Sequence, residues 1–170
     1  EVMALRNMVT ELSAARLCSH VSFHPVNLYD YMPEVKLSIA ALADANFSCT
    51  LYLEPDLPIV EFDPQLIKQA LLNLIKNAYE AMEKHGTIHL VVTSTAKSVQ
   101  LHVIDHGGGL DPALGNTIYQ PFVTTKTGGS GLGLAITKQI MESHHGTLTC
   151  ESRKGDGCTF TLTLPRTQAP

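Results

Sequence analysis

Apolar residues repeat with helical spacing through the middle of this chain. Between Asp63 and Gly86 they recur three or four positions apart, which gathers them on one face of a helix. Asp63 is a good N-cap, Pro64 suits the first helical position, and Gly86 interrupts the pattern. A polar stripe runs beside the apolar face, and its members are Asn73, Asn77, Glu80 and Lys84. The pattern predicts a long helix with one buried side.

Shorter patterns on either side predict further elements. We expect helices over 1–16, over 29–44 and from 132 to about 144. Alternating apolar and polar residues predict strands over 47–53, 87–95, 98–104, 147–151 and 159–164. Residues 24–29 are expected to be an extended connection, and residues 166–170 a disordered tail. This order of elements predicts an α/β fold, in which helices cover one face of a mixed sheet.

Composition narrows the class of protein. A chain of 170 residues suits one domain with a proper core. The net charge of -4 offers no basic surface, so we expect no nucleic acid partner. The cysteines at 18, 49, 150 and 158 form no C-x-x-C pair and are expected to be reduced thiols. Without a secretory signal or an apolar run of about 20 residues, a cytoplasmic location is expected, although a longer parent could carry a membrane segment before Glu1.

The candidate chemistry lies between residues 105 and 134. Asp105 follows a β-like run and can accept a hydrogen bond from an exocyclic amine, which adenine offers and guanine lacks at that position. Glycines at 107–109 and 128–133 allow close backbone approach, and the N–H groups of 131–133 at a helix start can hold phosphate oxygens. Taken singly, either glycine cluster could be a tight turn. No P-loop motif is present, and no buried strand precedes the second cluster as a dinucleotide fold requires.

Two amides in the long helix need a reason. Asparagine is unfavourable in a helix interior, yet Asn73 and Asn77 stand one turn apart beside the apolar face. They could be solvated surface positions. Alternatively, Asn77 could offer its carbonyl oxygen to Mg²⁺ held between nucleotide phosphates, because this hard cation prefers oxygen ligands.

Four motifs in a fixed order carry a resemblance to a known family. They are Asn73-Leu-Ile-Lys-Asn77-Ala, Asp105-x-Gly107-x-Gly109, Pro121-Phe122-x-Thr-Thr-Lys126 and Gly129-Ser-Gly131-Leu-Gly133-Leu. They resemble the N, G1, F and G2 boxes of sensor histidine kinases, and residues 157–165 resemble the closing strand of that family. The resemblance runs from about residue 17 to 165. The Asn-Ala-x-Glu-Ala wording at 77–81 is most similar to the nitrogen-regulation-like branch.

The resemblance implies a Bergerat ATP-binding fold of the GHKL superfamily. That fold is a two-layer α/β sandwich, with a mixed, mostly antiparallel sheet covered on one face by three helices. Here a short N-terminal helix would precede it. Residues 17–165 would form the catalytic kinase domain, and 1–16 the end of a dimerisation helix. Residues 119–130 would form a lid that ATP orders.

Residue roles also follow from the resemblance. Asn73, Asn77 and Lys126 would be catalytic, with Asn77 holding Mg²⁺ and Lys126 reaching the phosphates. Asp105 would read the adenine amine. The implied ATP-binding residues are Asn73, Lys76, Asn77, Glu80, Asp105, Gly107, Gly109, Phe122, Thr124, Thr125, Lys126, Ser130, Gly131, Leu132 and Gly133.

Two positions depart from the pattern of that family. Cys158 stands where Thr or Ser is more frequent, and Glu80 replaces a lysine that many relatives carry. The first change puts an adenine-side hydrogen bond in doubt. The second removes a phosphate contact and leaves more of that task to Lys126.

One position distinguishes the enzyme classes that share this fold. Gyrases, heat-shock chaperones and mismatch-repair ATPases place a glutamate where this chain has Asn73, and an amide cannot take a proton from water. A neutral histidine needs no such base to attack phosphorus, so a histidine kinase is favoured. The alternatives are a GHKL conformational ATPase and an anti-sigma-type serine kinase or nucleotide-dependent binding module. The apolar heptad spacing within residues 2–12 favours the sensor kinase.

The phosphoacceptor is not expected among the histidines of this chain. The acceptor histidine of the family is typically followed by Glu or Asp, and none of the eight histidines here is. We therefore expect the acceptor on dimerisation helices outside this chain, a response regulator as the partner of the full-length kinase, and a homodimer in that protein. The isolated chain should not label itself.

Overall fold

The computed structural model describes residues 16, 19–41, 45–121, 123–124 and 131–168. The helix expected over 1–16 lies outside these residues, apart from Arg16. The same holds for Phe122, for residues 125–130 and for the last two residues of the chain.

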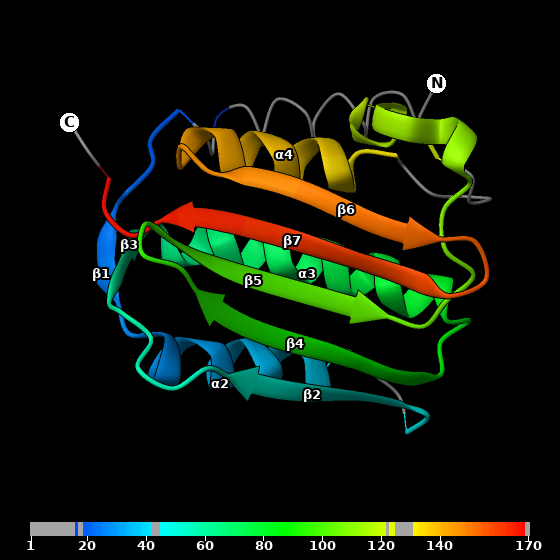
Figure 1. Ribbon diagram of the computed structural model, residues 1–170, viewed down its shortest axis with the longest axis horizontal. Coiled ribbons are helices and arrows are strands. Elements are labelled where there is room, and N and C mark those ends of the chain that lie inside the picture. The colour runs from blue at the N-terminus through cyan, green and yellow to red at the C-terminus, as the bar shows by residue number, and fades with distance from the viewer. Residues whose placement is uncertain (1–15, 17–18, 42–44, 122, 125–130, 169–170) are drawn as a thin grey trace.

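Five strands form the main sheet (Figure 1). Their order across the sheet is β2-β4-β5-β7-β6. β2 pairs with β4 in parallel, whereas each of the other neighbouring pairs is antiparallel. The prediction of a mixed, mostly antiparallel sheet is therefore confirmed. The strands span β2 Phe47–Leu53, β4 Gly86–Ser94, β5 Ser98–Asp105, β6 Thr147–Arg153 and β7 Gly157–Pro165.

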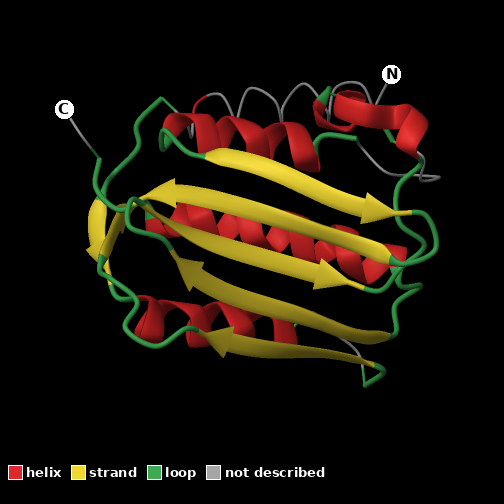
Figure 2. Cartoon of the chain, in the orientation of Figure 1, coloured by secondary structure: helices red, strands yellow, loops and turns green. Residues whose placement is uncertain are grey.

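In the part of the chain that the structure describes, three α-helices lie on one face of this sheet (Figure 2). They are α2 (Leu28–Ala40), α3 (Pro64–Ala81) and α4 (Gly133–Ser143). The expected two-layer α/β sandwich is thus confirmed. The predicted helix 29–44 is longer than α2, which ends at Ala40.

The central helix α3 begins where its capping residues predict. Asp63 Oδ1 accepts hydrogen bonds from the backbone N–H groups of Gln65 and Leu66, which the first helical turn leaves without partners. The apolar stripe of the helix then faces the sheet, and Ile67 and Leu71 are fully buried. Burial of this face sets the orientation of the helix, so its polar stripe comes to lie along one edge of the core.

Two elements differ from the expectations. Residues 24–26 are not a plain connection, because β1 (His24–Val26) pairs antiparallel with β3 (Val60–Phe62) as a second, two-stranded sheet. Three-residue strands are too short to show alternation, and their pairing spans a long stretch of sequence. The connection after Asp105 contains a 3₁₀ helix, η1 (Pro112–Tyr119), kinked at Gly115. Short 3₁₀ segments carry no 3.6-residue period, so the pattern did not reveal it.

The chain beyond β7 runs beside the small sheet. The Arg166 N–H donates to the Lys97 carbonyl, and the Arg166 carbonyl accepts from the Glu61 N–H. The Gln168 side chain donates to the His144 carbonyl. These residues belong to the segment 166–170, for which disorder is predicted.

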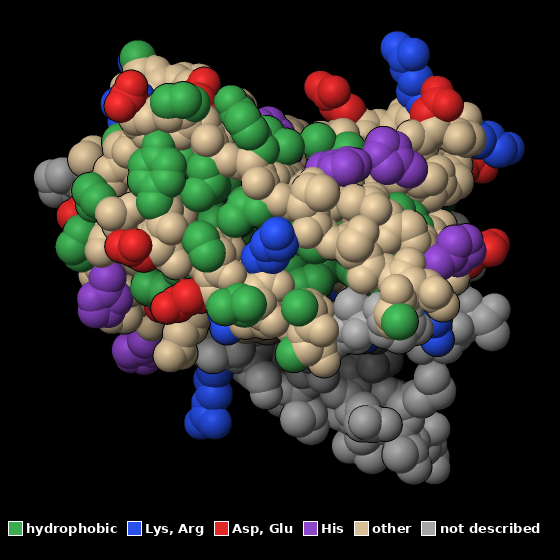
Figure 3. Space-filling model, turned by 90° about the horizontal axis from the view of Figure 1, so that it is seen from below, with side chains coloured by type: hydrophobic (Ala, Val, Ile, Leu, Met, Phe, Trp, Pro, Cys, Tyr) green, Lys and Arg blue, Asp and Glu red, His purple; other side chains and the backbone are tan. Residues whose placement is uncertain are grey.

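The surface near α2 and β2 carries mixed charge. In Figure 3, lysine and arginine side chains are scattered among acidic and histidine side chains on the face in view. None of the helices in the described ranges is long and apolar enough to cross a membrane.

Candidate functional site

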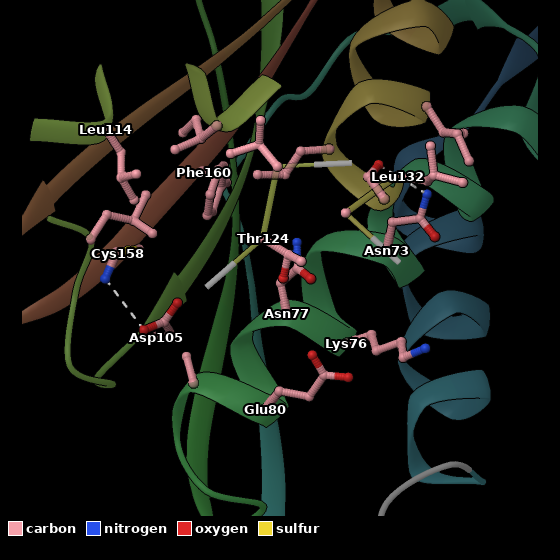
Figure 4. A pocket seen from close by; sticks show the side chains of 18 of the residues that line it. Asn73, Lys76, Asn77, Glu80, Asp105, Leu114, Thr124, Leu132, Cys158 and Phe160 are labelled. Atoms are coloured by element: carbon pink, nitrogen blue, oxygen red, sulfur yellow. Dashed lines mark hydrogen bonds between the residues drawn. The ribbon is translucent and has the colours of Figure 1, made fainter. Parts of the chain in front are cut away.

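A cavity of about 320 Å³ opens between α3, the start of α4, the end of β5 and the start of β7 (Figure 4). Asn73 and Asn77 border it from the polar stripe of α3. Asp105 reaches it from the end of β5, and Cys158 from the start of β7. Segments far apart in the sequence therefore converge on one hollow.

Asp105 is a buried carboxylate held in a fixed orientation. Its side chain is 4% exposed, and its Oδ1 accepts hydrogen bonds from the N–H groups of Gly107 (2.9 Å) and Cys158 (3.3 Å). Among the described residues, the hydrogen bonds to this carboxylate are made to Oδ1. The other oxygen belongs to a side chain that borders the cavity, where it can accept from a ligand.

Two glycines make this arrangement possible. Gly157 has a φ of +94°, and a Cβ there would lie 2.1 Å from the Asp105 carbonyl oxygen. Gly107 packs against the end of α3, where a Cβ would lie 2.7 Å from the Ala81 carbonyl oxygen. Both positions exclude a side chain because neighbouring backbone occupies the space. Gly107 thus brings the turn after β5 against α3 and is not among the residues that line the cavity.

Asn73 connects the two helices that border the cavity. Its Nδ2 donates to the Gly133 carbonyl (3.4 Å) and lies 3.5 Å from the buried Thr137 hydroxyl. Thr137 in turn donates to the same carbonyl at 2.8 Å. The amide therefore holds the start of α4 beside α3, one helical turn before Asn77.

The cavity gathers most of the described residues that the motifs single out. These are Asn73, Lys76, Asn77, Glu80, Asp105, Gly109, Thr124, Gly131, Leu132 and Gly133. Phe122, Thr125, Lys126 and Ser130 lie outside the described residues. The proximity of the motifs is a structural fact, and the role of each residue stays a prediction.

Four apolar residues of the wall were not expected from the sequence. Leu114 and Ile118 of η1, Ile136 of α4 and Phe160 of β7 line the same cavity. The two η1 residues could not be foreseen because η1 itself was not. Phe160 carried a usable signal, since it alternates in phase with the buried residues of β7.

The side chains near Asn77 fit a hard cation that brings most of its own ligands. Asn77 and Glu80 line the cavity from one helix face, and both carry oxygen atoms. No group of three or more His, Cys, Asp or Glu side chains that could hold a metal occurs in the part of the chain described. A Mg²⁺ ion that keeps waters and phosphate oxygens needs only one or two such side chains.

Comparison with protein families gives this cavity its class. Residues 62–168 match the family described as "Histidine kinase-, DNA gyrase B-, and HSP90-like ATPase". The match covers well over half of the chain, including α3, α4 and both glycine clusters. The chain belongs to this family of ATP-binding domains.

Curated proteins similar to this chain include bacterial kinases. The chain is 33% identical over 166 residues to "Sensor histidine kinase ZraS" of Escherichia coli (strain K12), which covers 97% of this chain and 36% of the relative. It is 36% identical over 143 residues to "Sporulation kinase A" of Bacillus subtilis (strain 168), covering 83% of this chain and 23% of the relative. The chain thus spans about a third or less of the length of these curated relatives.

Solved structures agree with the fold. The nucleotide-free catalytic domain of histidine kinase ThkA superposes with a TM-score of 0.77 at 30% identity, covering 86% of this chain and 99% of that domain. Full-length ShkA in complex with AMPPNP gives 0.84 at 26% identity, covering 99% of this chain and 37% of that one. The resemblance to sensor histidine kinases is confirmed, and the fold is that of their catalytic domains.

Proposed function

We propose that this chain binds Mg²⁺·ATP and transfers the γ-phosphoryl group to a histidine, as the catalytic part of a two-component sensor kinase. The observation that carries the proposal is a single cavity bordered by Asp105, Asn77 and the first residues of α4. Family membership supports ATP as the ligand, and the relatives, which are named as kinases, support the kinase reaction.

Adenine would occupy the end of the cavity nearest Asp105. The carboxylate oxygen that the turn leaves available can accept from the exocyclic amine, and Ile118 and Phe160 offer apolar contacts for a flat base. Guanine presents a carbonyl oxygen in place of that amine. Two acceptors would then face each other, so ATP should bind more tightly than GTP.

Phosphates would lie toward the start of α4. Gly131, Leu132 and Gly133 line the cavity where α4 begins, and the positive end of the helix dipole favours an anion there. Lys76 borders the cavity from α3. From the sequence resemblance, we also propose that Lys126 contacts the phosphates and that residues 119–130 form a lid.

Asn77 would hold Mg²⁺ through its side-chain oxygen, with Glu80 one turn further along the same face. When bound, the cation offsets the charge of the phosphates. The protein's own part is to place the amide beside the start of α4, which the Asn73 contact with Gly133 accomplishes.

Asn73 favours transfer to a side chain over transfer to water. Its amide is engaged with Gly133 and Thr137, and it has no basic group to take a proton from a water molecule. In the proposed reaction, a neutral imidazole nitrogen forms the new N–P bond as the bond from phosphorus to the β-phosphate oxygen breaks and ADP leaves. The nucleophile needs no deprotonation before attack, so the amide at position 73 is sufficient.

The acceptor histidine is proposed to lie on dimerisation helices outside this chain. His144 is fully buried, and His102 is bonded to the hydroxyls of Thr93 (3.1 Å) and Thr161 (2.9 Å). No histidine of the chain is followed by an acidic residue. In keeping with this, we propose that residues 1–16 end a dimerisation helix and that 17–165 form the cytoplasmic catalytic domain. A homodimeric parent would pass its phosphoryl group to a response regulator.

Two measurements test the proposal. The first is calorimetric titration of the chain with ATP and with GTP, each with and without Mg²⁺; ATP with Mg²⁺ should bind most tightly. The second is incubation with γ-labelled ATP, alone and together with the acceptor helices of a ZraS-type kinase. The helices should gain label that acid removes and base does not, while the chain alone stays unlabelled.

The outcomes separate the competing functions. Acid-stable label would indicate transfer to serine and contradict the histidine kinase. Rapid release of free phosphate without any protein label would indicate a conformational ATPase. Labelling of the chain itself would place the acceptor within it.

A further inference from the structure

Two cysteine thiols meet beside the nucleotide cavity. In the antiparallel register of β6 and β7, Ser152 lies opposite Cys158 and Cys150 lies opposite Phe160. Cys150 and Cys158 are therefore diagonal neighbours on the same face of the sheet, and each thiol shifts the pKa of the other. Cys158 lines the nucleotide cavity, and Cys150 lines a second hollow beside η1.

The surroundings of Cys158 stabilise its thiolate. Hydrogen bonding from the Cys150 thiol lowers the pKa of Cys158 to about 7, although desolvation and the charge of Asp105 act in the opposite direction. Ser152 Oγ lies 3.2 Å from the Cys158 sulfur and also 3.2 Å from the Gly157 carbonyl. Its single hydroxyl proton can turn from that carbonyl to the sulfur when the thiol ionises. The same thiol pair raises the pKa of Cys150, so Cys150 keeps its proton while Cys158 becomes the nucleophile.

Cys49 offers a contrast within the same sheet. Burial raises the pKa of Cys49 to about 11, partly opposed by the charge of Lys36. A small oxidant should therefore react with Cys158 before Cys49.

We propose that the Cys150–Cys158 pair is a site of reversible oxidation by hydroperoxides, and that its disulfide form binds ATP weakly. The effect on ATP rests on the proposed function, whereas the oxidation itself does not. Diagonal cross-strand Cα atoms are usually about 7–8 Å apart, slightly beyond the range that disulfides bridge without movement. Closing the bond therefore draws the start of β7 toward β6. The Cys158 N–H that supports Asp105 Oδ1 at 3.3 Å moves with it.

The chemistry balances with hydrogen peroxide as the oxidant. The Cys158 thiolate attacks one peroxide oxygen, the O–O bond breaks, and the departing hydroxide takes up the proton that Cys158 released, giving water and a sulfenic acid. The Cys150 sulfur then attacks the Cys158 sulfur. The S–S bond forms as the S–O bond breaks, and the hydroxyl leaves with the Cys150 proton as a second water. Two thiols lose two electrons and two protons in total, and a dithiol reductant reverses the change.

The test uses the chain with Cys18→Ser and Cys49→Ser, so that only the pair remains. After peroxide treatment and its removal, intact mass should fall by two hydrogen atoms without dimer formation. Affinity for Mg²⁺·ATP by calorimetry should fall about tenfold or more, and dithiothreitol should restore it. Saturating ATP before peroxide should slow the oxidation.

Single changes in that background assign the steps. Cys150→Ser keeps a hydrogen-bond donor for the Cys158 sulfur but cannot form the disulfide, so the reaction should stop at the sulfenic acid, which dimedone captures at Cys158. Cys158→Ser should lose the peroxide effect, judged against its own untreated affinity. In the wild-type chain, Cys49 should remain unmodified at peroxide doses that oxidise the pair.

Two results would overturn the inference. One is a complete Cys150–Cys158 disulfide with unchanged ATP affinity; the other is a pair that stays reduced while Cys49 is oxidised. If the untreated chain does not bind ATP at all, the proposed function fails, and the mass measurement still decides whether the pair is an oxidation site.

Discussion

Asp105 serves the local turn and the cavity with different oxygen atoms. Oδ1 accepts from Gly107 and Cys158 and so holds the ends of β5 and β7 together. Because those bonds orient the carboxylate, its second oxygen can accept a hydrogen bond from a nucleobase without rotation of the side chain. A substitution can therefore alter the proposed contact with adenine and leave the contact between β5 and β7 in place.

Asp105→Asn should fold but bind ATP more weakly. An amide oxygen can still accept from Gly107, whereas the charge-assisted bond to adenine is lost. We expect a loss of about 1.5–3 kcal/mol in binding free energy, the usual worth of a hydrogen bond to a charged group. Calorimetry with ATP and with GTP measures this loss, and the difference in affinity between the two nucleotides should become smaller. Unaltered ATP affinity would mean that adenine does not meet this carboxylate.

Asn77→Ala should remove most of the dependence of ATP binding on Mg²⁺. Alanine favours the helix more than asparagine does, so α3 should persist. We expect Mg²⁺ to increase ATP affinity on the order of tenfold less in the variant than in wild type, a loss similar to that seen when residues around a metal site are changed. Gln65→Ala, an exposed change on the same helix, is the control and should behave as wild type. Equal Mg²⁺ dependence in both variants would refute the metal assignment.

Gly157 and Gly155 form a matched pair of turn positions. Both have positive φ, +94° and +90°, but only a Cβ at Gly157 meets backbone; at Gly155 nothing lies within 4 Å. Gly155→Ala should therefore lose about 1–2 kcal/mol of stability through backbone strain alone. Gly157→Ala should lose at least about 2 kcal/mol more, and ATP affinity with it, because Asp105 must shift. Urea unfolding of both variants measures the difference, and equal losses would show that the contact does not matter.

Helices α3 and α4 are joined at their far ends by a buried histidine. His144 follows α4, and its Nδ1–H donates to the Ile140 carbonyl at 2.7 Å. Its Nε2 accepts from the N–H of Asp63, the N-cap of α3, at 3.0 Å. Asp63 also accepts from the Ser22 N–H at 3.0 Å, which ties the N-terminal connection to the same point. The helices that carry the cavity are thus held together through a neutral imidazole.

Stability should fall as the pH is lowered below about 6.5, the unperturbed histidine pKa. Burial lowers the pKa of His144 in the folded chain, partly opposed by its bond to Ile140 and by the Asp63 charge. Between the two pKa values, the histidine is therefore protonated in the unfolded chain and neutral in the folded chain. The contribution is complete above the unfolded pKa and is lost as the pH falls toward the folded one, by at most about 1.4 kcal/mol per pH unit.

Urea unfolding between pH 8 and 5 tests this dependence. His144→Gln keeps an acceptor for the Asp63 N–H but cannot titrate, so its stability should depend less on pH than that of wild type. Burial also lowers the pKa of His102, which will leave part of the slope in place. His20→Gln, at an exposed position, should keep the full slope. A slope that His144→Gln leaves intact would contradict the assignment.

The cavity exists only because the complete domain is folded. Its wall takes residues from α3, β5, η1, α4 and β7, and no segment contributes more than part of it. A ligand that binds there should therefore stabilise the entire unit rather than one local region.

Mg²⁺·ATP should raise the melting temperature of the chain. At a concentration of 100 times Kd, a ligand specific for the folded state adds about 2.7 kcal/mol. A domain of this size gains about 2–4 °C for each kcal/mol, so a shift of several degrees is expected. The order should be ATP with Mg²⁺ above ATP alone above GTP in a thermal denaturation scan. An equal shift with GTP would contradict adenine recognition.

Local patterns were sufficient for the long elements and for the motifs. The start of α3 at Pro64 and the alternation along β5 and β7 depend on neighbours a few residues away, so capping and periodicity reveal them. The β1–β3 pair and η1 were missed because three-residue strands and a kinked 3₁₀ segment have no such period. Leu114 and Ile118, which line the cavity from η1, were missed along with it.

The order of the four motifs, read from the chain alone, was enough to indicate an ATP-binding domain of the sensor kinase type, since each motif is a short run of adjacent residues. Only the tertiary structure decided that Asn73 holds Gly133, that Cys158 supports Asp105, and that Cys150 lies against Cys158. These contacts join residues that are distant along the chain. Their proximity follows from how strands pair and helices pack, and a local pattern carries no record of it.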